Sequence, residues 1–175
     1  MVFDTHAHYD DEVFSLDFDD LVFSLKQAGV GGIITCGCDK ESSLKAIELA
    51  EKYDIIYAAV GIHPGNVDDG DTMNDIKPLL SHKKCVAVGE IGLDYYWRQD
   101  TKEKQKEVFE NQILLAKELD LPIIVHDRDA HGDVMEVIRE FPRVRGVLHS
   151  FSGSAEMAEE LIEKGYYISF SGTLT

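Results

Sequence analysis

The sequence of residues 86–94 is VAVGEIGLD, an apolar run interrupted only by glycines and by Glu90 before it closes at Asp94. Apolar residues follow one another here instead of alternating with polar ones, a pattern typical of a parallel strand covered on both faces. A carboxylate in such a strand is costly to bury unless it is paired. Glu90 therefore indicates either a bound cation or a structural salt bridge to Arg98 or Arg128.

Similar apolar runs lie on both sides of this one, with helical patterns between them. They are Val2 with Phe3, Ile33–Cys36, Ile55–Gly61, Ile123–Val125, Val144–Leu148 and Tyr166–Phe170. Strands that alternate with helices predict a parallel α/β fold, either a doubly wound sheet or a β/α barrel. No dinucleotide-binding or phosphate-loop glycine pattern follows any of these runs. Since no linker or composition step interrupts the chain, we expect one domain over residues 1–175.

Two of the helices have recognisable start signals. Asp100 and Glu103 predict a capping-box-like start for a helix over residues 100–119. Ser154 predicts the N-cap of a later helix. The residues of that helix expected to face the core are Met157, Leu161 and Ile162.

The formal charge is -16, from 33 acidic and 17 basic residues, the wrong sign for holding nucleic acid by charge alone. A phosphate-bearing substrate would need bound cations or a local basic rim. The N-terminus lacks the features of a signal peptide and no apolar run is long enough to span a bilayer, so we expect a cytoplasmic protein without membrane contact. Cys36, Cys38 and Cys85 are predicted to be reduced and mostly buried.

Most of the histidines fall where predicted strands end. Of the 7 in the chain, only His82 and His131 lie elsewhere. The carboxyl ends of parallel strands form one rim, so side chains from distant parts of the chain converge there. The residues expected at this rim are His6, His8, His63, His126 and His149.

The chemistry of this set points to a metal ion. His6 and His8 are two residues apart on a strand, so both imidazoles point to the same side. Neutral imidazole and carboxylate suit zinc, manganese, iron or, less typically, magnesium. Each histidine alone could equally be a core residue bonded to a backbone carbonyl, but four of them beside Glu90 favour a metal site.

Five motifs together resemble one known family. They are Asp4-Thr5-His6-Ala7-His8-Tyr9, Gly61-Ile62-His63-Pro64, Gly89-Glu90-Ile91-Gly92-Leu93-Asp94-Tyr95, His126-Asp127-Arg128 and Leu148-His149-Ser150-Phe151-Ser152-Gly153. In order and spacing they resemble the TatD-related metal-dependent deoxyribonucleases of the amidohydrolase superfamily. The resemblance covers essentially the whole chain and implies a TIM-type β/α barrel that hydrolyses DNA, commonly from the 3′ end.

The resemblance also implies a dinuclear site with two divalent ions, Mg, Mn or Zn. His6 and His8 would hold the first ion and His126 and His149 the second, with Glu90 bridging them. The family pattern continues to an eighth strand ending in Thr-Asp, whereas this chain ends directly after its seventh strand. We therefore expect about seven of the eight strands, and self-association or a complementing fragment at the open barrel edge.

Several further residues are candidates for substrate contact. His63 and Glu90 are the candidate catalytic groups, with a structural role equally open for His63. Arg128 and Arg98 are candidates for pairing with phosphate. Tyr95, with its neighbours Tyr96 and Trp97, is a candidate for stacking on a base, although packing of the loop is the commoner role for such residues.

Two other interpretations of the chain remain open at this point. The same site would suit a cyclic amide, a lactone or a phosphotriester, as elsewhere in the superfamily. The chain could also be an inactive metal-binding fragment that needs a partner.

Overall fold

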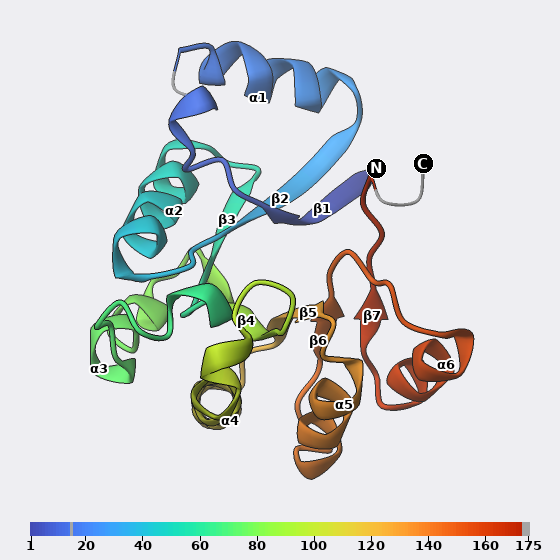
Figure 1. Ribbon diagram of the computed structural model, residues 1–175. Coiled ribbons are helices and arrows are strands. Elements are labelled where there is room, and N and C mark those ends of the chain that lie inside the picture. The colour runs from blue at the N-terminus through green and yellow to red at the C-terminus, as the bar shows by residue number, and fades with distance from the viewer. Residues whose placement is uncertain (15, 173–175) are drawn as a thin grey trace.

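The computed structural model describes residues 1–14 and 16–172, in which one sheet of parallel strands runs in the order β1 to β7 (Figure 1). The strands are β1 Val2–Ala7, β2 Val30–Cys36, β3 Ile56–Val60, β4 Cys85–Asp94, β5 Ile123–Arg128, β6 Gly146–Leu148 and β7 Tyr167–Ile168. Each strand pairs with the next one in the sequence. The predicted α/β class and the barrel alternative are thus confirmed, as a curved half-barrel.

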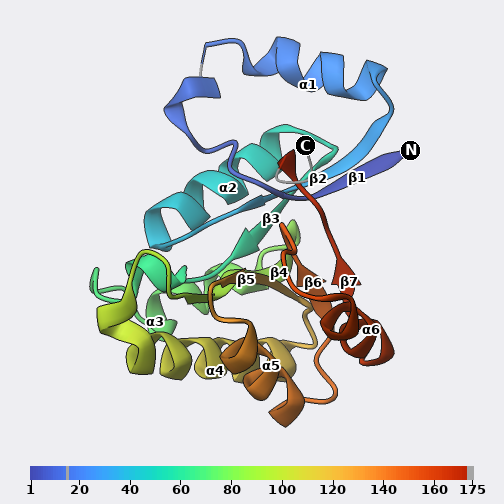
Figure 2. The ribbon, with the colours of Figure 1, turned by 45° about the vertical axis from the view of Figure 1, so that its right-hand side comes forward.

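Helices connect the strands and lie around the outer side of the curved sheet (Figure 2). They are α1 Phe18–Gln27, α2 Lys40–Lys52, α3 Met73–Ile76, α4 Lys102–Leu119, α5 His131–Glu140 and α6 Ala155–Glu163. Short 3-10 turns occur at Glu12–Phe14, Pro64–Asn66, Leu79–Ser81 and Gln99–Thr101. In the described part of the chain, no helix is both long enough and apolar enough to cross a membrane.

Two apolar layers explain why the strands are continuous apolar runs. Ile123 and Val125 of β5 belong to the large core between the sheet and the helices. The intervening Ile124 belongs to a smaller cluster on the other face of the sheet, inside the half-barrel. The other buried members of the inner cluster are Cys36, Ala59, Ala87 and Val147. Both faces of the strands are therefore buried, which removes the alternation of polar residues.

The helix starts agree only in part with the sequence. Ser154 accepts a hydrogen bond from the backbone N–H of Met157, so the predicted N-cap of α6 is confirmed. The capping box at Asp100 is wrong, because Asp100 lies in a 3-10 turn and its carboxylate accepts from Arg98. Ile162 was expected to face the core, but it is 61% exposed, whereas Leu161 is fully buried.

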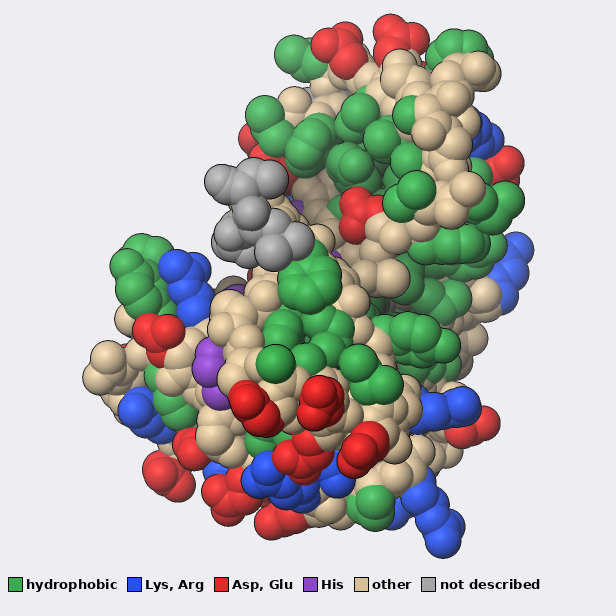
Figure 3. All heavy atoms as spheres, turned by 90° about the vertical axis from the view of Figure 1, so that its right-hand side faces the viewer, with side chains coloured by type: hydrophobic (Ala, Val, Ile, Leu, Met, Phe, Trp, Pro, Cys, Tyr) green, Lys and Arg blue, Asp and Glu red, His purple; other side chains and the backbone are tan. Residues whose placement is uncertain are grey.

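The first and last strands form the two edges of the sheet. Val2 and Phe3 on β1 and Tyr167 on β7 are largely exposed. Figure 3 shows hydrophobic side chains gathered across the middle of the face that looks toward this opening. The expected self-association or complementing fragment at this edge stays a prediction.

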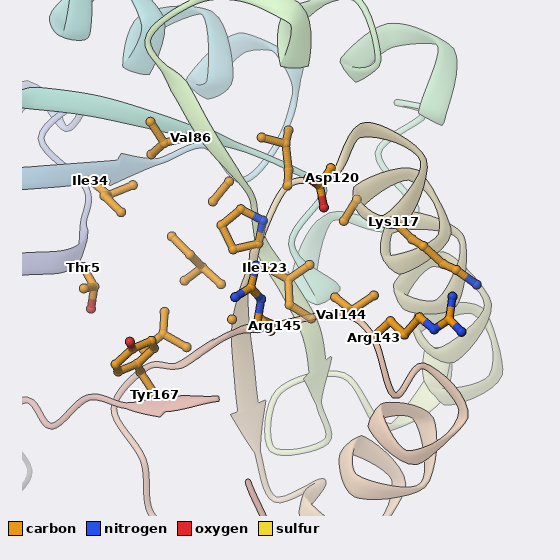
Figure 4. A pocket seen from close by; sticks show the side chains of 17 residues that line it. Thr5, Ile34, Val86, Lys117, Asp120, Ile123, Arg143, Val144, Arg145 and Tyr167 are labelled. Carbon is orange, nitrogen blue, oxygen red and sulfur yellow. The ribbon is translucent and has the colours of Figure 1, made fainter. Parts of the chain in front are cut away.

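A pocket of about 610 Å³ lies in the half-barrel at the amino ends of the strands (Figure 4). Ile123 and Val147 line it, Tyr167 borders it, and Arg143 and Arg145 stand at one side. Among the residues that the structure describes, no histidine lines this pocket, so it is separate from the candidate metal ligands.

Candidate metal centre

Five histidines meet at the carboxyl ends of the strands, as predicted. His6 lies in β1 and His126 in β5, while the others follow the ends of their strands. Glu90 lies in β4, and His126 pairs with Gly92 of that strand. A Cβ atom at Gly92 would collide with the backbone oxygen of His126, so only glycine lets β4 and β5 approach this closely. His82 and His131 lie outside the cluster and contact Glu51 and Asp127 instead.

The carboxylate of Glu90, only 2% exposed, lies at the centre of the cluster. Its Oε2 atom faces Nε2 of His6 at 2.7 Å and Nε2 of His8 at 3.2 Å. Its Oε1 atom faces Nδ1 of His126 and Nε2 of His149, each at 2.6 Å. The two carboxylate oxygens are therefore divided between two pairs of imidazoles. In the described residues, every ion pair of Glu90 is with a histidine, and neither Arg98 nor Arg128 is among its partners.

In His8 and His126, the ring nitrogen that points away from Glu90 makes a hydrogen bond that fixes the tautomer of the neutral ring. The other nitrogen then presents a lone pair to Glu90. Nδ1 of His8 lies 3.0 Å from the backbone oxygen of Cys36, which can only accept, so Nδ1 carries the proton. Nε2 of His126 lies 3.0 Å from Oδ2 of Asp94 and donates to it. In the neutral rings, Nε2 of His8 and Nδ1 of His126 are thus free to act as metal ligands.

His63 is oriented in the opposite sense. Its Nδ1 atom accepts a hydrogen bond from the backbone N–H of Gly65 at 2.9 Å. The proton of the neutral ring must then be on Nε2, which lies 3.7 Å from Oε1 of Glu90. His63 is close enough to be grouped with Glu90 and His126 as a set of possible ligands. The protonated Nε2 instead makes His63 a hydrogen-bond donor that points into the centre.

Burial and the contacts between Glu90 and the imidazoles have opposite effects on the pKa values of the cluster. Burial raises the pKa of Glu90, but the surrounding imidazoles, which donate hydrogen bonds to its carboxylate when they are protonated, outweigh burial and hold the pKa well below its ordinary value. Burial lowers the pKa of His126, yet Glu90 and Asp94 outweigh burial and raise it. For His149 and His63 burial prevails, and the pKa of His63 falls to about 4.

The donor set fits divalent cations. One buried carboxylate cannot hydrogen-bond equally with all the nitrogens around it, and Nδ1 of His126 lies only 3.2 Å from Nε2 of His149. Cations between the carboxylate and the rings would relieve this crowding of lone pairs. The group formed by His6, His8 and Glu90 also has the spacing of a metal site.

The other predicted contacts lie around this centre. Arg98 is tied to Asp68 and Asp100 and donates to the backbone oxygen of Gly65. Tyr95 is buried, and its hydroxyl donates to Asp133 at 2.7 Å. The polar groups of Arg98 and Tyr95 are therefore already bonded to partners outside the imidazole cluster. Arg128 is exposed at the end of β5, two residues after His126.

Sequence reasoning missed the role of Asp94 as the partner of His126. It also missed Gln105, whose Oε1 accepts from the backbone N–H of Asp94 at 2.8 Å and whose Nε2 donates to the backbone oxygens of Asp94 and Arg98. A buried aspartate that closes an apolar strand was a usable signal for Asp94. Nothing in the sequence pattern singled out Gln105.

The chain is similar to known proteins over nearly all of its length. Residues 3–175 match the family described as TatD related DNase. The uncharacterized metal-dependent hydrolase YabD of Bacillus subtilis is 45% identical over 100% of this chain and 70% of YabD. The 3′-5′ ssDNA/RNA exonuclease TatD of Citrobacter koseri is 32% identical over 98% of this chain and 67% of that protein. The crystal structure of the TatD homolog YjjV from Escherichia coli has a TM-score of 0.91 at 37% identity, covering 99% of this chain and 69% of YjjV.

Proposed function

This chain belongs to the TatD-related DNase family and is a metal-dependent hydrolase, and from that premise we propose that it hydrolyses phosphodiester bonds of DNA. The similarity to an exonuclease named for single-stranded DNA and RNA supports removal of nucleotides from the 3′ end. The net charge of -16 opposes binding of a phosphate, so this function requires cations at the site.

The observation that carries the proposal is the divided carboxylate of Glu90. Its Oε2 atom faces His6 and His8, and its Oε1 atom faces His126 and His149. Two divalent ions, Mg, Mn or Zn, would be held by these two pairs with Glu90 bridging. Such a pair of ions supplies charge neutralisation of the phosphate and a more acidic bound water.

The remaining residues act on the substrate directly. The proton on Nε2 of His63 is placed to donate to a phosphate oxygen, because Gly65 occupies the other ring nitrogen. Arg128 is exposed beside the centre and can pair with a neighbouring phosphate through its N–H groups. His63 and Arg128 thus orient the phosphodiester, while Glu90 would hold the two divalent ions.

The test is a nuclease assay with matched variants. Single-stranded DNA labelled at its 5′ end is incubated with the protein and each of Mg²⁺, Mn²⁺ and Zn²⁺, and products are resolved by length. We expect stepwise shortening from the 3′ end with the wild-type protein and none with Glu90→Gln. His82→Ala removes a histidine outside the cluster and should leave the activity unchanged.

A panel of lactones, cyclic amides and phosphotriesters is assayed in parallel. Turnover of one of these compounds without cleavage of DNA would replace the proposal by a small-molecule hydrolase. Tight binding of metal without turnover of any substrate would make the chain a metal-binding protein in isolation.

A further inference from the structure

We propose that Tyr96, Trp97 and Arg128 form a stacking platform that holds an unpaired base of a single-stranded nucleic acid beside the metal centre. The inference rests on the proposed function, since it names the form of nucleic acid that this centre receives. It adds a binding site of its own, outside the cluster of imidazoles.

The three side chains form one exposed unit. The guanidinium carbon of Arg128 lies 4.2 Å from the ring centroid of Tyr96 and 5.5 Å from that of Trp97. The two aromatic rings meet edge to face at 4.6 Å. Tyr96 is 51% exposed and Trp97 is 67% exposed, so ring surface remains open to a ligand.

Buried groups hold this unit in place. One oxygen of Asp94, Oδ1, accepts hydrogen bonds from the backbone N–H groups of Tyr96 and Trp97 at 3.0 and 2.9 Å. The other oxygen, Oδ2, is the one that accepts from His126. A single carboxylate therefore fixes both a candidate metal ligand and the turn that displays the two rings. A site positioned in this way loses little conformational entropy when it binds a ligand.

The platform lies next to the metal centre along β5. Arg128 and His126 are two residues apart in this strand, so their side chains leave the same side of it, with Cα atoms about 7 Å apart. The backbone oxygen of Arg128 accepts from the N–H of Tyr95, which joins the strand to the aromatic turn. A base on the platform would therefore belong to the nucleotide that reacts or to its neighbour.

Charge supports a nucleotide as the occupant. Among residues 1–14 and 16–172, no carboxylate lies within ion-pair distance of Arg128, whereas Arg98 is neutralised by Asp68 and Asp100. A guanidinium that stacks on a ring keeps its N–H groups in its own plane, where they can still bind phosphate. The platform thus offers a flat apolar surface for a base and a free cation for the adjoining phosphate.

Single strands are the form that can use such a surface. In a duplex each base is covered by its neighbours, whereas an unpaired base has an open face that can stack on an aromatic ring. Every base can stack on an aromatic ring, so the platform should prefer single strands to duplexes without a preference for sequence.

Trp97 is the only tryptophan of the chain and reports directly on the platform. A phosphorothioate oligothymidine of about eight nucleotides, which resists hydrolysis, is titrated into the metal-loaded protein while tryptophan emission is recorded. We expect saturable quenching, and a much smaller change with a blunt hairpin duplex of the same backbone. Equal quenching by the duplex would overturn the preference for single strands.

Variants are compared by the anisotropy of a labelled oligothymidine. Tyr96→Ala and Trp97→Ala should each weaken binding by about 5- to 150-fold, the range that follows from loss of one stacked base. Arg128→Lys keeps the charge but loses the planar stack and should also weaken binding. Tyr57→Ala is the matched control: it removes another exposed tyrosine under a cation, Lys84, near the amino end of β3. This control should bind as the wild-type protein does.

The nuclease assay separates the two proposals. If DNA is cleaved but emission is unchanged and the platform variants bind like wild type, the platform is wrong and the proposed function stands. If emission is quenched and the variants bind weakly while no phosphodiester is cleaved, the platform stands and the proposed function fails. If the protein neither binds nor cleaves the oligonucleotides, both are overturned.

Discussion

The carboxylate of Asp94 accepts a hydrogen bond from Nε2 of His126 at 3.0 Å, on the side of the ring away from Glu90. This contact keeps the proton of His126 on Nε2 and leaves Nδ1 as the atom that faces Glu90. A partner on the far nitrogen both orients a metal-binding imidazole and makes it a stronger donor. Asp94 should therefore affect metal binding without touching the metal.

Asp94→Asn tests this relationship. An amide has only one oxygen, so it cannot accept from His126 and from the Tyr96–Trp97 turn at the same time. We expect affinity for the second ion to fall by about 10- to 100-fold, measured by calorimetric titration of the metal-free protein. Asp133→Asn, which removes the charge of the carboxylate that accepts from Tyr95, is the control. Unchanged metal affinity in Asp94→Asn would show that the contact has no role in binding.

Removal of single ligands should separate the two ions. His126→Ala should lose the second ion first, and His6→Ala the first, because their imidazoles face different oxygens of Glu90. Elemental analysis of protein purified without chelator gives the number of ions retained, and we expect about two for the wild type. Dialysis against a chelator should also lower the melting temperature, since an ion held at 100 times its Kd stabilises the fold by about 2.7 kcal/mol. If the wild-type protein retains no metal, the histidine cluster is not a metal site.

Glu90→Gln should damage catalysis more than His63→Ala. The carboxylate is a charge that both ions share, and without it binding of both should weaken together. His63 supplies one hydrogen bond, and loss of one such donor typically lowers kcat by about 100- to 1,000-fold. His63→Ala should therefore retain both ions and a measurable rate, while Glu90→Gln retains neither. Equal kinetics and equal metal content in the two variants would exclude the bridging role of Glu90.

Much of this arrangement could be predicted from the sequence, and the reason is topological. In a parallel sheet the carboxyl ends of all strands meet, so histidines that follow apolar runs had to converge. This rule placed His6, His126 and His149 together although they are far apart in the chain. The family assigned from the motifs is likewise confirmed, because residues 3–175 match it.

The orientation of individual side chains could not be predicted. His63 and His126 each close an apolar run in the sequence, but only the hydrogen bond from Gly65 shows that the protonated nitrogen of His63 points toward the centre. Arg98 and Arg128 looked equivalent until Asp68 and Asp100 were seen to neutralise the first. The first distinction depends on the conformation of the turn after β3, and the second depends partly on Asp68, which is 30 residues away from Arg98 in the sequence. The apolar patterns that predict strands and helices record neither.

Gln112 should be important for stability, because it is fully buried and bonds to the backbone on both sides of its amide. Its Oε1 accepts from the N–H of Ile62 at 2.7 Å, and its Nε2 donates to the oxygen of Ile62 at 2.9 Å. Gln112→Leu leaves two buried backbone groups without partners, at a cost of about 1–3 kcal/mol each. Urea unfolding measures this loss, and Asn111→Leu, at an exposed position of the same helix, should be nearly neutral. A loss below 1 kcal/mol in Gln112→Leu would mean that water or a shift of the backbone replaces the amide.

His63 should also make the stability of the metal-free protein depend on pH. Burial lowers its pKa from 6.5 to about 4 in the folded chain. As the pH falls below 6.5, the unfolded chain takes up a proton that the folded chain excludes, so the free energy of unfolding decreases until about pH 4 and then levels off. His63→Gln removes this term, and at pH 4 wild type should have lost up to about 3 kcal/mol more than the variant, relative to pH 8. Urea unfolding in the presence of a chelator measures both proteins across this range, with His82→Gln as the control for losing a histidine outside the cluster. Parallel pH profiles for wild type and His63→Gln would show that His63 is protonated as easily in the folded chain as in the unfolded one.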